Sequence, residues 1–287
     1  MGVVQNRMLE QICLQQAPGL ALMPPAPQGR AWRLIGCVLL ASLLGACAHG
    51  PESEVTTQAL RAPTPWDVAS VGNALPAEQA PTAPSRWQHL TFPGKTANQF
   101  AYLQVDGRRA MGVRSGSAVS MLRKIVSIDP EQLAGLRFSW KVPSLIAGAD
   151  LGLREKEDSP VRLVLAFDGD RSRMSPRDHM LSELARTLTG EEMPYATLMY
   201  VWSNHHVPGT VLKSWRTERI RKLVLESGPD RLNRWLDYER DIRADFVAAF
   251  GEEPGRLMAV GIMTDTDNTR SKTQAWYGPV VLGTAGR

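Results

Sequence analysis

The sequence predicts a mainly β domain of the sandwich or barrel type, and three observations support this fold class. In many short segments after Trp87, apolar and polar residues alternate with a period of two, as in strands with one buried face. Turn-forming pairs such as Asp106-Gly107 and Pro208-Gly209 separate these segments. About ten short strands with turns between them are typical of a sandwich or barrel.

The N-terminal part has the features of a bacterial export signal. Arg30 and Arg33 precede residues 34–44, which form a mainly apolar run. A positive flank before a short apolar stretch is typical of a secretory signal peptide, whereas a helix that spans a bilayer needs roughly 20 residues. We therefore predict a signal peptide over residues 1–46, with Met23 as the alternative translation start.

Residues 44–47, with the sequence Leu-Gly-Ala-Cys, resemble the lipobox of bacterial lipoproteins. In that family the cysteine becomes the new N-terminus and carries several acyl chains, which make a stable membrane anchor. The resemblance implies lipidation of Cys47, and Ala48 in the next position favours the outer membrane, facing the periplasm. The alternatives are a secreted protein with an incidental cysteine and a buried helix at the start of a fold.

Composition restricts the classes of function. Removal of residues 1–46 takes away three arginines and one glutamate, so the formal net charge falls from +4 to +2. Nucleic-acid binding requires a clustered basic face, and no such cluster is present, so no nucleic-acid partner is predicted. Cys47 is the only cysteine of the mature chain, which excludes a disulfide framework, a thiolate zinc cluster and a cysteine nucleophile.

Residues 47–85 are predicted to be a lipidated N-terminus followed by a disordered tether. Six prolines stand among small and polar residues without sustained periodicity, and such a segment cannot bury enough apolar surface to fold alone. Trp66 is the exception and is consistent with a short segment that docks back onto the domain. The folded domain is predicted over residues 86–287, which is long enough for one sizeable core.

The clearest strand lies at residues 136–142, where the even-numbered side chains are large and apolar and the odd-numbered ones are polar. This alternation places Trp140 on the core-facing side. Residues 161–167 and 236–239 repeat the spacing. Weaker strand-like runs occupy residues 117–128, 197–203, 217–225, 257–264 and 274–282.

Two short helices are predicted among the strands. Ser175 is placed as an N-cap, Pro176 stands at the first helical position, and Gly190 ends the run. A second helix covers residues 241–250 and ends at Gly251. The first helix carries an apolar stripe formed by Met180, Leu181, Leu184, Ala185 and Leu188.

Four strings together resemble a bacterial exported-protein family known as domain of unknown function 3047. They are found in order at residues 165–170, 198–202, 260–269 and 275–280. The resemblance extends over residues 87–282, and its most specific part is the string Thr-Asp-Thr-Asp-Asn-Thr at residues 264–269. It implies a jelly-roll-like antiparallel β-sandwich similar to galactose-binding modules. It implies no established activity, so no catalytic residues are carried over.

Asp265, Asp267 and Asn268 place two carboxylates and an amide oxygen at the expected end of a strand. Hard oxygen ligands suit Ca²⁺, but an EF-hand loop that began at Asp265 would need glycine and a carboxylate where this chain has Arg270 and Trp276. The preferred interpretation is a polar turn whose side chains bond their own backbone. No metal ligand is assigned, and Ca²⁺ remains the one cofactor to test.

Asp168 and Asp170 follow the strand predicted at residues 161–167. With Asp265 and Asp267 they would supply paired carboxylates for acid–base cleavage of a glycan if the two strand ends met. The alternative is a solvated turn.

His205 and His206 follow Asn204 directly. Adjacent residues on a strand point to opposite faces, so the two histidines are not expected to bind one metal ion. The sequence contains no zinc-protease motif, serine-hydrolase elbow or phosphate-binding glycine loop.

The preferred function is a non-catalytic, membrane-anchored envelope protein that binds a glycan or another ligand, including an envelope protein. Aromatic residues beside polar strand ends can stack on sugar rings, with core packing as the alternative for each. The alternative functions are an envelope glycan hydrolase that uses the aspartates and a structural or assembly protein. The candidate ligand-binding residues are Asp168, Asp170, Trp202, Asn204, Asp265, Asp267, Asn268, Trp276 and Tyr277.

Overall fold

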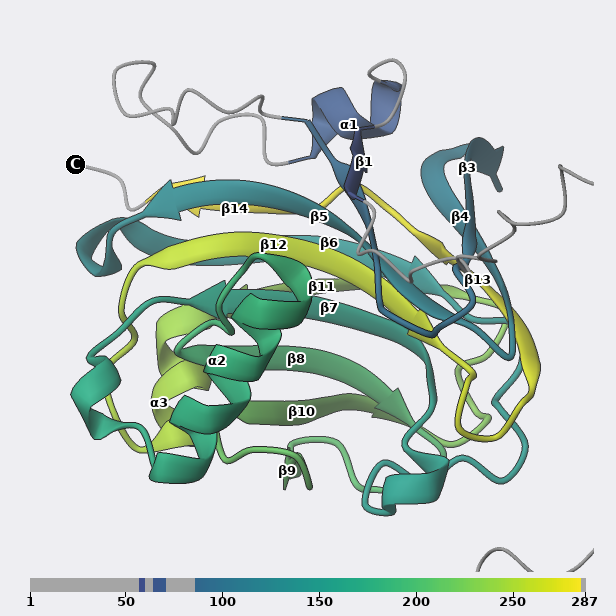
Figure 1. The fold of residues 1–287 in the computed structure, drawn as a ribbon. Helices are drawn as coiled ribbons and strands as arrows, with labels where there is room; N and C mark the ends of the chain where they lie inside the picture. Colours follow the sequence, from purple (N-terminus) through teal and green to yellow (C-terminus); the bar gives the residue numbers. More distant parts are fainter. Residues whose placement is uncertain (1–56, 60–63, 71–85, 285–287) are drawn as a thin grey trace, which may run out of the picture. The chain divides into compact units, whose positions relative to one another are not determined.

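The computed structural model describes residues 57–59, 64–70 and 86–284, whose strands form two sheets (Figure 1). The predicted signal peptide, Cys47 and most of the predicted tether lie outside the described residues. Among the residues that are described, no helix combines the length and the apolar character needed to cross a membrane.

The larger sheet has eight strands in the order β1-β2-β5-β12-β7-β8-β10-β9. Every neighbouring pair is antiparallel except β8 and β10, which run parallel. The strands are β1 (Thr57–Ala59), β2 (Gln88–Thr91), β5 (Val119–Ile128), β12 (Leu257–Asp265), β7 (Ser159–Phe167), β8 (Ala196–Ser203), β10 (Ile220–Ser227) and β9 (Val211–Lys213).

The smaller sheet has the order β11-β6-β13-β4-β3, with β14 paired to β6, and all its pairs are antiparallel. These two sheets confirm the mainly β, jelly-roll-like sandwich, although the parallel β8–β10 pair departs from a wholly antiparallel fold. The strands are β11 (Trp235–Asp241), β6 (Leu133–Lys141), β13 (Lys272–Tyr277), β4 (Arg108–Gly116), β3 (Gln99–Val105) and β14 (Val281–Thr284).

The core lies between the two sheets. Phe138 of β6 stacks on Tyr200 of β8 with a distance of 5.8 Å between ring centroids. Tyr277 of β13 also bridges the sheets, because its hydroxyl donates a hydrogen bond of 2.6 Å to the carbonyl of Met263 in β12. Trp140 is fully buried, which confirms the core face predicted for residues 136–142.

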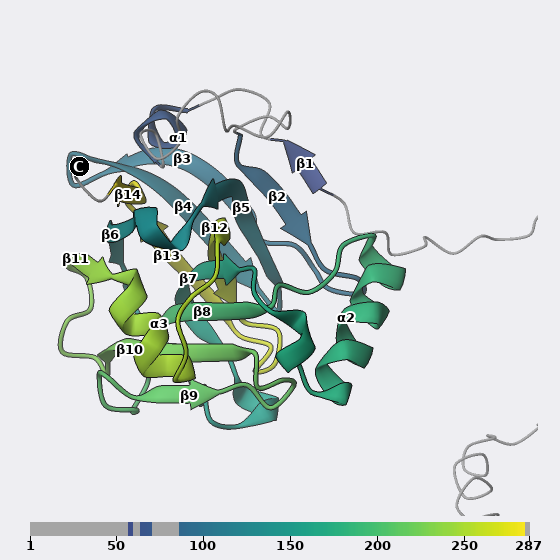
Figure 2. The same cartoon turned by 90° about the vertical axis from the view of Figure 1, so that its left-hand side faces the viewer.

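Both predicted helices are present, as α2 (Pro176–Thr189) and α3 (Ile242–Phe250). The hydroxyl of Ser175 accepts the amide of Asp178 at 3.1 Å, and Gly190 and Gly251 end the helices with positive φ. Helix α3 contacts β6, β11 and β10, so it covers one edge of the space between the sheets (Figure 2). Three short 3₁₀ helices are Pro130–Gln132, Arg154–Lys156 and Arg171–Arg173.

The apolar stripe of α2 does not face the core as its periodicity suggests. Met180, Leu184 and Leu188 are more than half exposed, and α2 lies outside the space between the sheets (Figure 2). The helix buries Asp178 and Ser182 instead, because Asp178 accepts hydrogen bonds from the N-cap and from Thr217. Polar anchoring of one turn thus fixes the orientation of this helix.

A short helix, α1 (Pro65–Ala69), lies within the segment predicted to be a tether. Trp66 is fully buried, its indole N–H donates to the carbonyl of Tyr277 at 2.9 Å, and its ring centroid is 4.8 Å from that of Trp87. The amide of Val280 also donates to the hydroxyl of Ser70 at 3.1 Å. The start of the domain at residue 86 is therefore wrong, since α1 supplies part of the core.

Candidate functional site

Three neighbouring strands of the smaller sheet place two tryptophans beside one lysine. Trp235 of β11 and Trp276 of β13 both pair with Lys141 of β6, and opposite residues on paired antiparallel strands share a face. Trp140 is buried in the core, and successive side chains alternate between faces. The row Trp235–Lys141–Trp276 therefore lies on the outer face of the sheet, where both tryptophans are partly exposed. We call it the tryptophan row.

The tryptophan row continues across β4 at a glycine that makes room for an aromatic ring. Trp276 pairs with Gly112, and a Cβ at Gly112 would lie 2.6 Å from a methyl carbon of Leu103 and 3.3 Å from the indole of Trp276. Glycine at this position thus lets Leu103 and Trp276 approach each other across the strand. The result is a continuous apolar strip over neighbouring strands.

Each tryptophan of the row has a cation beside it. The amine of Lys141 is 5.8 Å from the ring centroid of Trp276 and 2.6 Å from a carboxylate oxygen of Asp106. The guanidinium of Arg108 is 5.5 Å from the Trp235 ring and 2.7 Å from a carboxylate oxygen of Asp237. The face therefore combines aromatic surface with charged hydrogen-bonding groups.

A groove with a volume of about 760 Å³ adjoins the tryptophan row. Ser139 and Gly278 form part of its wall, and a Cβ at Gly278 would lie 2.1 Å from the hydroxyl oxygen of Ser139, so a larger residue there would displace this hydroxyl. The polar side chains that line the groove are Arg108, Arg109, Arg137, Ser139, Asp237 and Glu239. These groups can donate and accept hydrogen bonds with a polyhydroxyl ligand.

Two of the three aromatic residues predicted to contact a ligand are buried. Trp276 belongs to the tryptophan row, but Trp202 and Tyr277 are 0% and 1% exposed. The indole of Trp202 donates to the carbonyl of Gly228 at 3.1 Å. Both buried side chains lie on the core-facing register of their strands, so they stabilise the fold and cannot contact a ligand.

The four aspartates proposed for a hydrolase do not converge. In the antiparallel pair of β7 and β12, Phe167 pairs with Leu257 at one end and Ser159 with Asp265 at the other. Asp168 and Asp170 follow Phe167, so they lie a strand length of roughly 25 Å from Asp265 and Asp267. The arrangement needed for glycan cleavage by these residues is therefore contradicted.

Asp168 and Asp170 both bond local backbone, as the solvated-turn interpretation requires. A carboxylate oxygen of Asp168 accepts the amide of Gly169 at 2.9 Å, and one of Asp170 accepts the amide of Ser172 at 3.0 Å. These hydrogen bonds fix the turn and the following 3₁₀ helix.

The string after β12 folds into a cluster of three carboxylates, those of Asp158, Asp265 and Asp267, whose ligand oxygens lie within 4.8 Å of one another. Asp265 forms an ion pair of 3.1 Å with the buried Arg162, and Asp267 pairs with Lys95. Burial raises the pKa of Asp265 to about 8, and the adjacent Asp267 adds to this against the opposing effect of Arg162.

Asp158 and Asn268 hold the acidic string to the loop before β7. Asp158 accepts the amides of Asn268 and Thr269 at 3.2 and 2.7 Å, and the side-chain amide of Asn268 donates to the carbonyl of Arg154 at 2.8 Å. A cation at this cluster would compete with two ion pairs and these hydrogen bonds. The polar turn with no assigned metal ligand stays the preferred interpretation, and Ca²⁺ stays the cofactor to test.

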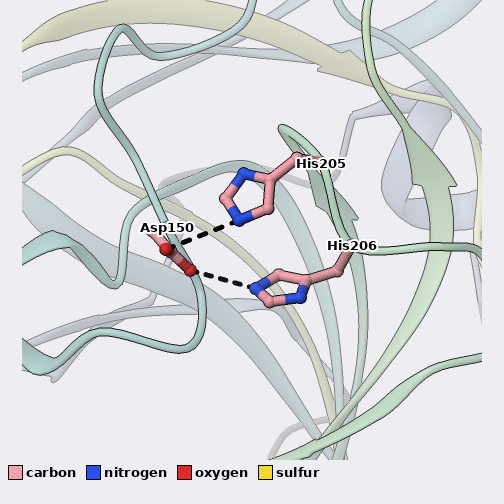
Figure 3. A group of neighbouring side chains, drawn as sticks. All are labelled: Asp150, His205 and His206. Carbon is pink, nitrogen blue, oxygen red and sulfur yellow. Dashed lines mark hydrogen bonds and ion pairs between the residues drawn. The ribbon is translucent and has the colours of Figure 1, made fainter.

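The two histidines do not obey the alternation expected of a strand. His205 and His206 lie after the end of β8 at Ser203, and both imidazoles point to the carboxylate of Asp150 (Figure 3). The interpretation that they diverge is therefore wrong. Asn204 lies between the end of β8 and the two histidines. Its side-chain amide donates a hydrogen bond of 2.7 Å to the carbonyl of Ile146.

Two partners in these sites were missed from the sequence. Trp235 was within reach of the sequence pattern, because Leu236 and Tyr238 alternate inward and so place residue 235 on the outer face. The sequence pattern could not identify Asp150, because this residue lies in an irregular loop more than fifty residues from the histidines it contacts.

A family profile described as "Protein of unknown function (DUF3047)" matches residues 85–281. This span includes both sheets except the short strand β1 and the end of β14. No curated protein matches the chain.

Solved structures similar to the chain include the following two. One is the xyloglucanase domain of NopAA, a type three effector from Sinorhizobium fredii in complex with cellobiose, with a TM-score of 0.39, 8% identity, and coverage of 71% of this chain and 96% of that one. The other is the endo-1,4-β-glucanase CelB2, with a TM-score of 0.34, 9% identity, and coverage of 71% and 89%.

Proposed function

The chain belongs to the DUF3047 family of proteins of unknown function, and we propose that it is a lipid-anchored envelope protein that binds a glycan. The binding surface is the tryptophan row with the adjoining groove. The observation that carries this proposal is the pairing of Trp235 and Trp276 with the same residue, Lys141, on the outer face of the smaller sheet.

The chemistry of this surface suits a sugar chain. An indole offers a flat apolar surface of the kind that packs on the apolar face of a sugar ring. The backbones of β11 and β13 are separated by two strand spacings, about 10 Å, which is close to the length of a disaccharide. Lys141 stands between the indoles, and the groove supplies further charged and hydroxyl groups for the sugar hydroxyls.

Replacing Trp235 or Trp276 with alanine is expected to weaken glycan binding by about tenfold, because loss of one aromatic contact costs about 0.5–1.5 kcal/mol beyond buried area. The double variant is expected to lose measurable binding. The measurement is retention of the purified full chain on immobilised cell-wall and plant polysaccharides, followed by titration with oligosaccharides of the polymer that retains it.

The matched control is Trp215→Ala. Trp215 is 38% exposed, its ring contacts the guanidinium groups of Arg154 and Arg216, and it does not line the groove. This variant should bind like the parent. Equal binding by the parent and the Trp235→Ala, Trp276→Ala double variant would refute the proposed binding surface.

The proposed anchor places the domain at the outer membrane, facing the periplasm, through lipid on Cys47. A Cys47→Ser variant is expected to remain unprocessed or to become soluble, because the acyl chains provide the membrane affinity. Cell fractionation and labelling with a radioactive fatty acid measure this. If the variant is cut and sediments with membranes as the parent does, the chain is not a lipoprotein.

A further inference from the structure

One carboxylate, that of Asp150, faces two imidazoles that follow the end of β8 in the larger sheet (Figure 3). The distance from Nε2 of His206 to one oxygen of Asp150 is 3.0 Å, and the distance from Nε2 of His205 to the other oxygen is 3.4 Å. The two imidazole centroids are 4.5 Å apart. The three side chains therefore bring two imidazole nitrogens and one carboxylate together, with one ligand atom from each residue within 4.8 Å of the others.

A tight turn after β8 brings both histidines to the same side. The hydroxyl of Ser203 accepts the backbone amides of His205 and His206 at 3.3 and 3.0 Å. This side-chain-to-backbone bonding replaces the extended conformation in which adjacent side chains diverge. Asn204 ties the same turn to the loop that carries Asp150 through its bond to Ile146.

The loop that carries Asp150 is also held in place. Asp150 accepts the amide of Gly152 at 2.9 Å, and the buried amine of Lys222 donates to the carbonyl of Leu151 at 2.6 Å while pairing with Glu157 at 2.9 Å. A Cβ at Gly152 would lie 3.3 Å from a carboxylate oxygen of Asp150 and 3.4 Å from Nε2 of His206, so this residue lies directly beside the three side chains. The ligand atoms are thus positioned by the fold.

We propose that Asp150, His205 and His206 bind a divalent transition-metal ion of the zinc class. In a tetrahedral centre with metal–ligand bonds of about 2.0–2.1 Å, the ligand atoms lie about 3.3 Å apart. The contacts of 3.0 and 3.4 Å join the two nitrogens to different oxygens of the carboxylate and are close to that separation, and one ligand atom from each residue lies within 4.8 Å of the others. Two imidazoles favour zinc, cobalt, nickel or copper over calcium and magnesium, which prefer oxygen ligands.

The exposure of the three side chains suits an accessible metal. The side chain of His205 is 54% exposed, and those of His206 and Asp150 are 24% and 23% exposed. Three protein ligands with an exposed side leave a coordination position for water or an exogenous ligand.

This site does not depend on the proposed glycan-binding function. The histidines follow β8 in the larger sheet, whereas the tryptophan row is on the smaller sheet. Metal binding and glycan binding can therefore fail separately.

Titration of the full chain with Zn²⁺, after removal of bound metal by a chelator, tests the proposal. Calorimetry is expected to show one equivalent bound through this site, and Co²⁺ is expected to give the visible absorption of a four- or five-coordinate centre with nitrogen and oxygen ligands. The His205→Ala, His206→Ala and Asp150→Asn variants should each lose this equivalent. Asp150→Asn preserves the shape of the side chain, and thermal unfolding in chelator checks that each variant is folded.

Two control variants remove histidines elsewhere, His179→Ala on α2 and His49→Ala outside the described residues. Both should keep the equivalent and its Co²⁺ spectrum. The proposal is overturned if the parent shows no saturable Zn²⁺ binding, or if a His205→Ala, His206→Ala double variant keeps the same equivalent. Displacement of Zn²⁺ by an equal concentration of Ca²⁺ would overturn the assigned metal class.

Discussion

Replacing Trp66 with alanine is expected to lower the free energy of unfolding by about 3–5 kcal/mol, the cost of truncating a fully buried tryptophan. The side chain has no exposed surface, and its ring packs against Trp87 with centroids 4.8 Å apart. The substitution also removes the hydrogen bond of 2.9 Å from the indole to the carbonyl of Tyr277. Urea unfolding followed by circular dichroism measures the loss.

The matched control lies on the same short helix. Val68 is 71% exposed, so Val68→Ala should change the free energy of unfolding by no more than about 0.5 kcal/mol. An unfolding midpoint of Trp66→Ala equal to that of the parent would show that α1 is not part of the folded unit. For the same reason, a chain that begins at residue 86 should be less stable than one that retains Trp66.

The strands were predictable because each is a short run of mostly apolar residues between turn residues, and β7, β8 and β12 are buried along nearly their whole length. Residues 161–167, 197–203 and 257–264 were each identified to within two residues of β7, β8 and β12. The period of two also identified the core face of residues 136–142. Alternation of this kind is a property of a single strand, so it can be recognised in the sequence without information on which strands are neighbours.

Features that depend on contacts between distant segments were not predictable. The composition of residues 47–85, with six prolines, indicates a tether. Composition does not show that one residue of this segment, Trp66, is fully buried in the core. The apolar stripe on α2 indicates a buried face, but the hydrogen bonds of Asp178 hold the helix in an orientation in which this stripe is exposed. Sequence spacing also contains no sign that β8 and β10 run parallel.

The candidate sites show the same division. The position of Trp202 and Tyr277 beside polar strand ends suggests ligand-binding side chains, but their register in the strands places both in the core. The register of three strands creates the tryptophan row, and the meeting of two loops creates the group of Asp150, His205 and His206. Residue type could suggest the chemistry, but only the pairing of strands and loops could assemble it.

The contribution of Asp265 to the stability of the parent is expected to fall as pH rises from 5.5 to 8. Asp265 is 7% exposed, and burial among the carboxylates of Asp158 and Asp267 raises its pKa to about 8 despite the ion pair with Arg162. The unfolded chain releases this proton near pH 3.9. Between those values the folded state binds more protons than the unfolded state, so its stability decreases with rising pH.

The carboxyl of Asp267 does not reverse this slope. Burial works to raise its pKa, but hydrogen bonds and charge from Lys95 hold it below its ordinary value. Its contribution to stability is therefore present above the ordinary pKa of an aspartate and is lost only as pH falls below it. Between pH 5.5 and 8, the decrease caused by Asp265 is on the order of 3 kcal/mol.

An Asp265→Asn variant should remove this decrease, because asparagine has the shape of the protonated acid and does not titrate. Denaturant unfolding at pH 5.5 and pH 8 measures the difference, and comparison with the parent cancels the contribution of other groups that titrate in this window. Asp168→Asn, on a partly exposed turn at the other end of the strands, is the matched control and should keep the slope of the parent. If the Asp265→Asn variant keeps the slope of the parent, Asp265 does not titrate in this window because Arg162 keeps it ionised. The cluster would then be stabilised by the ion pair, and the expectation that Asp265 retains a proton would be wrong.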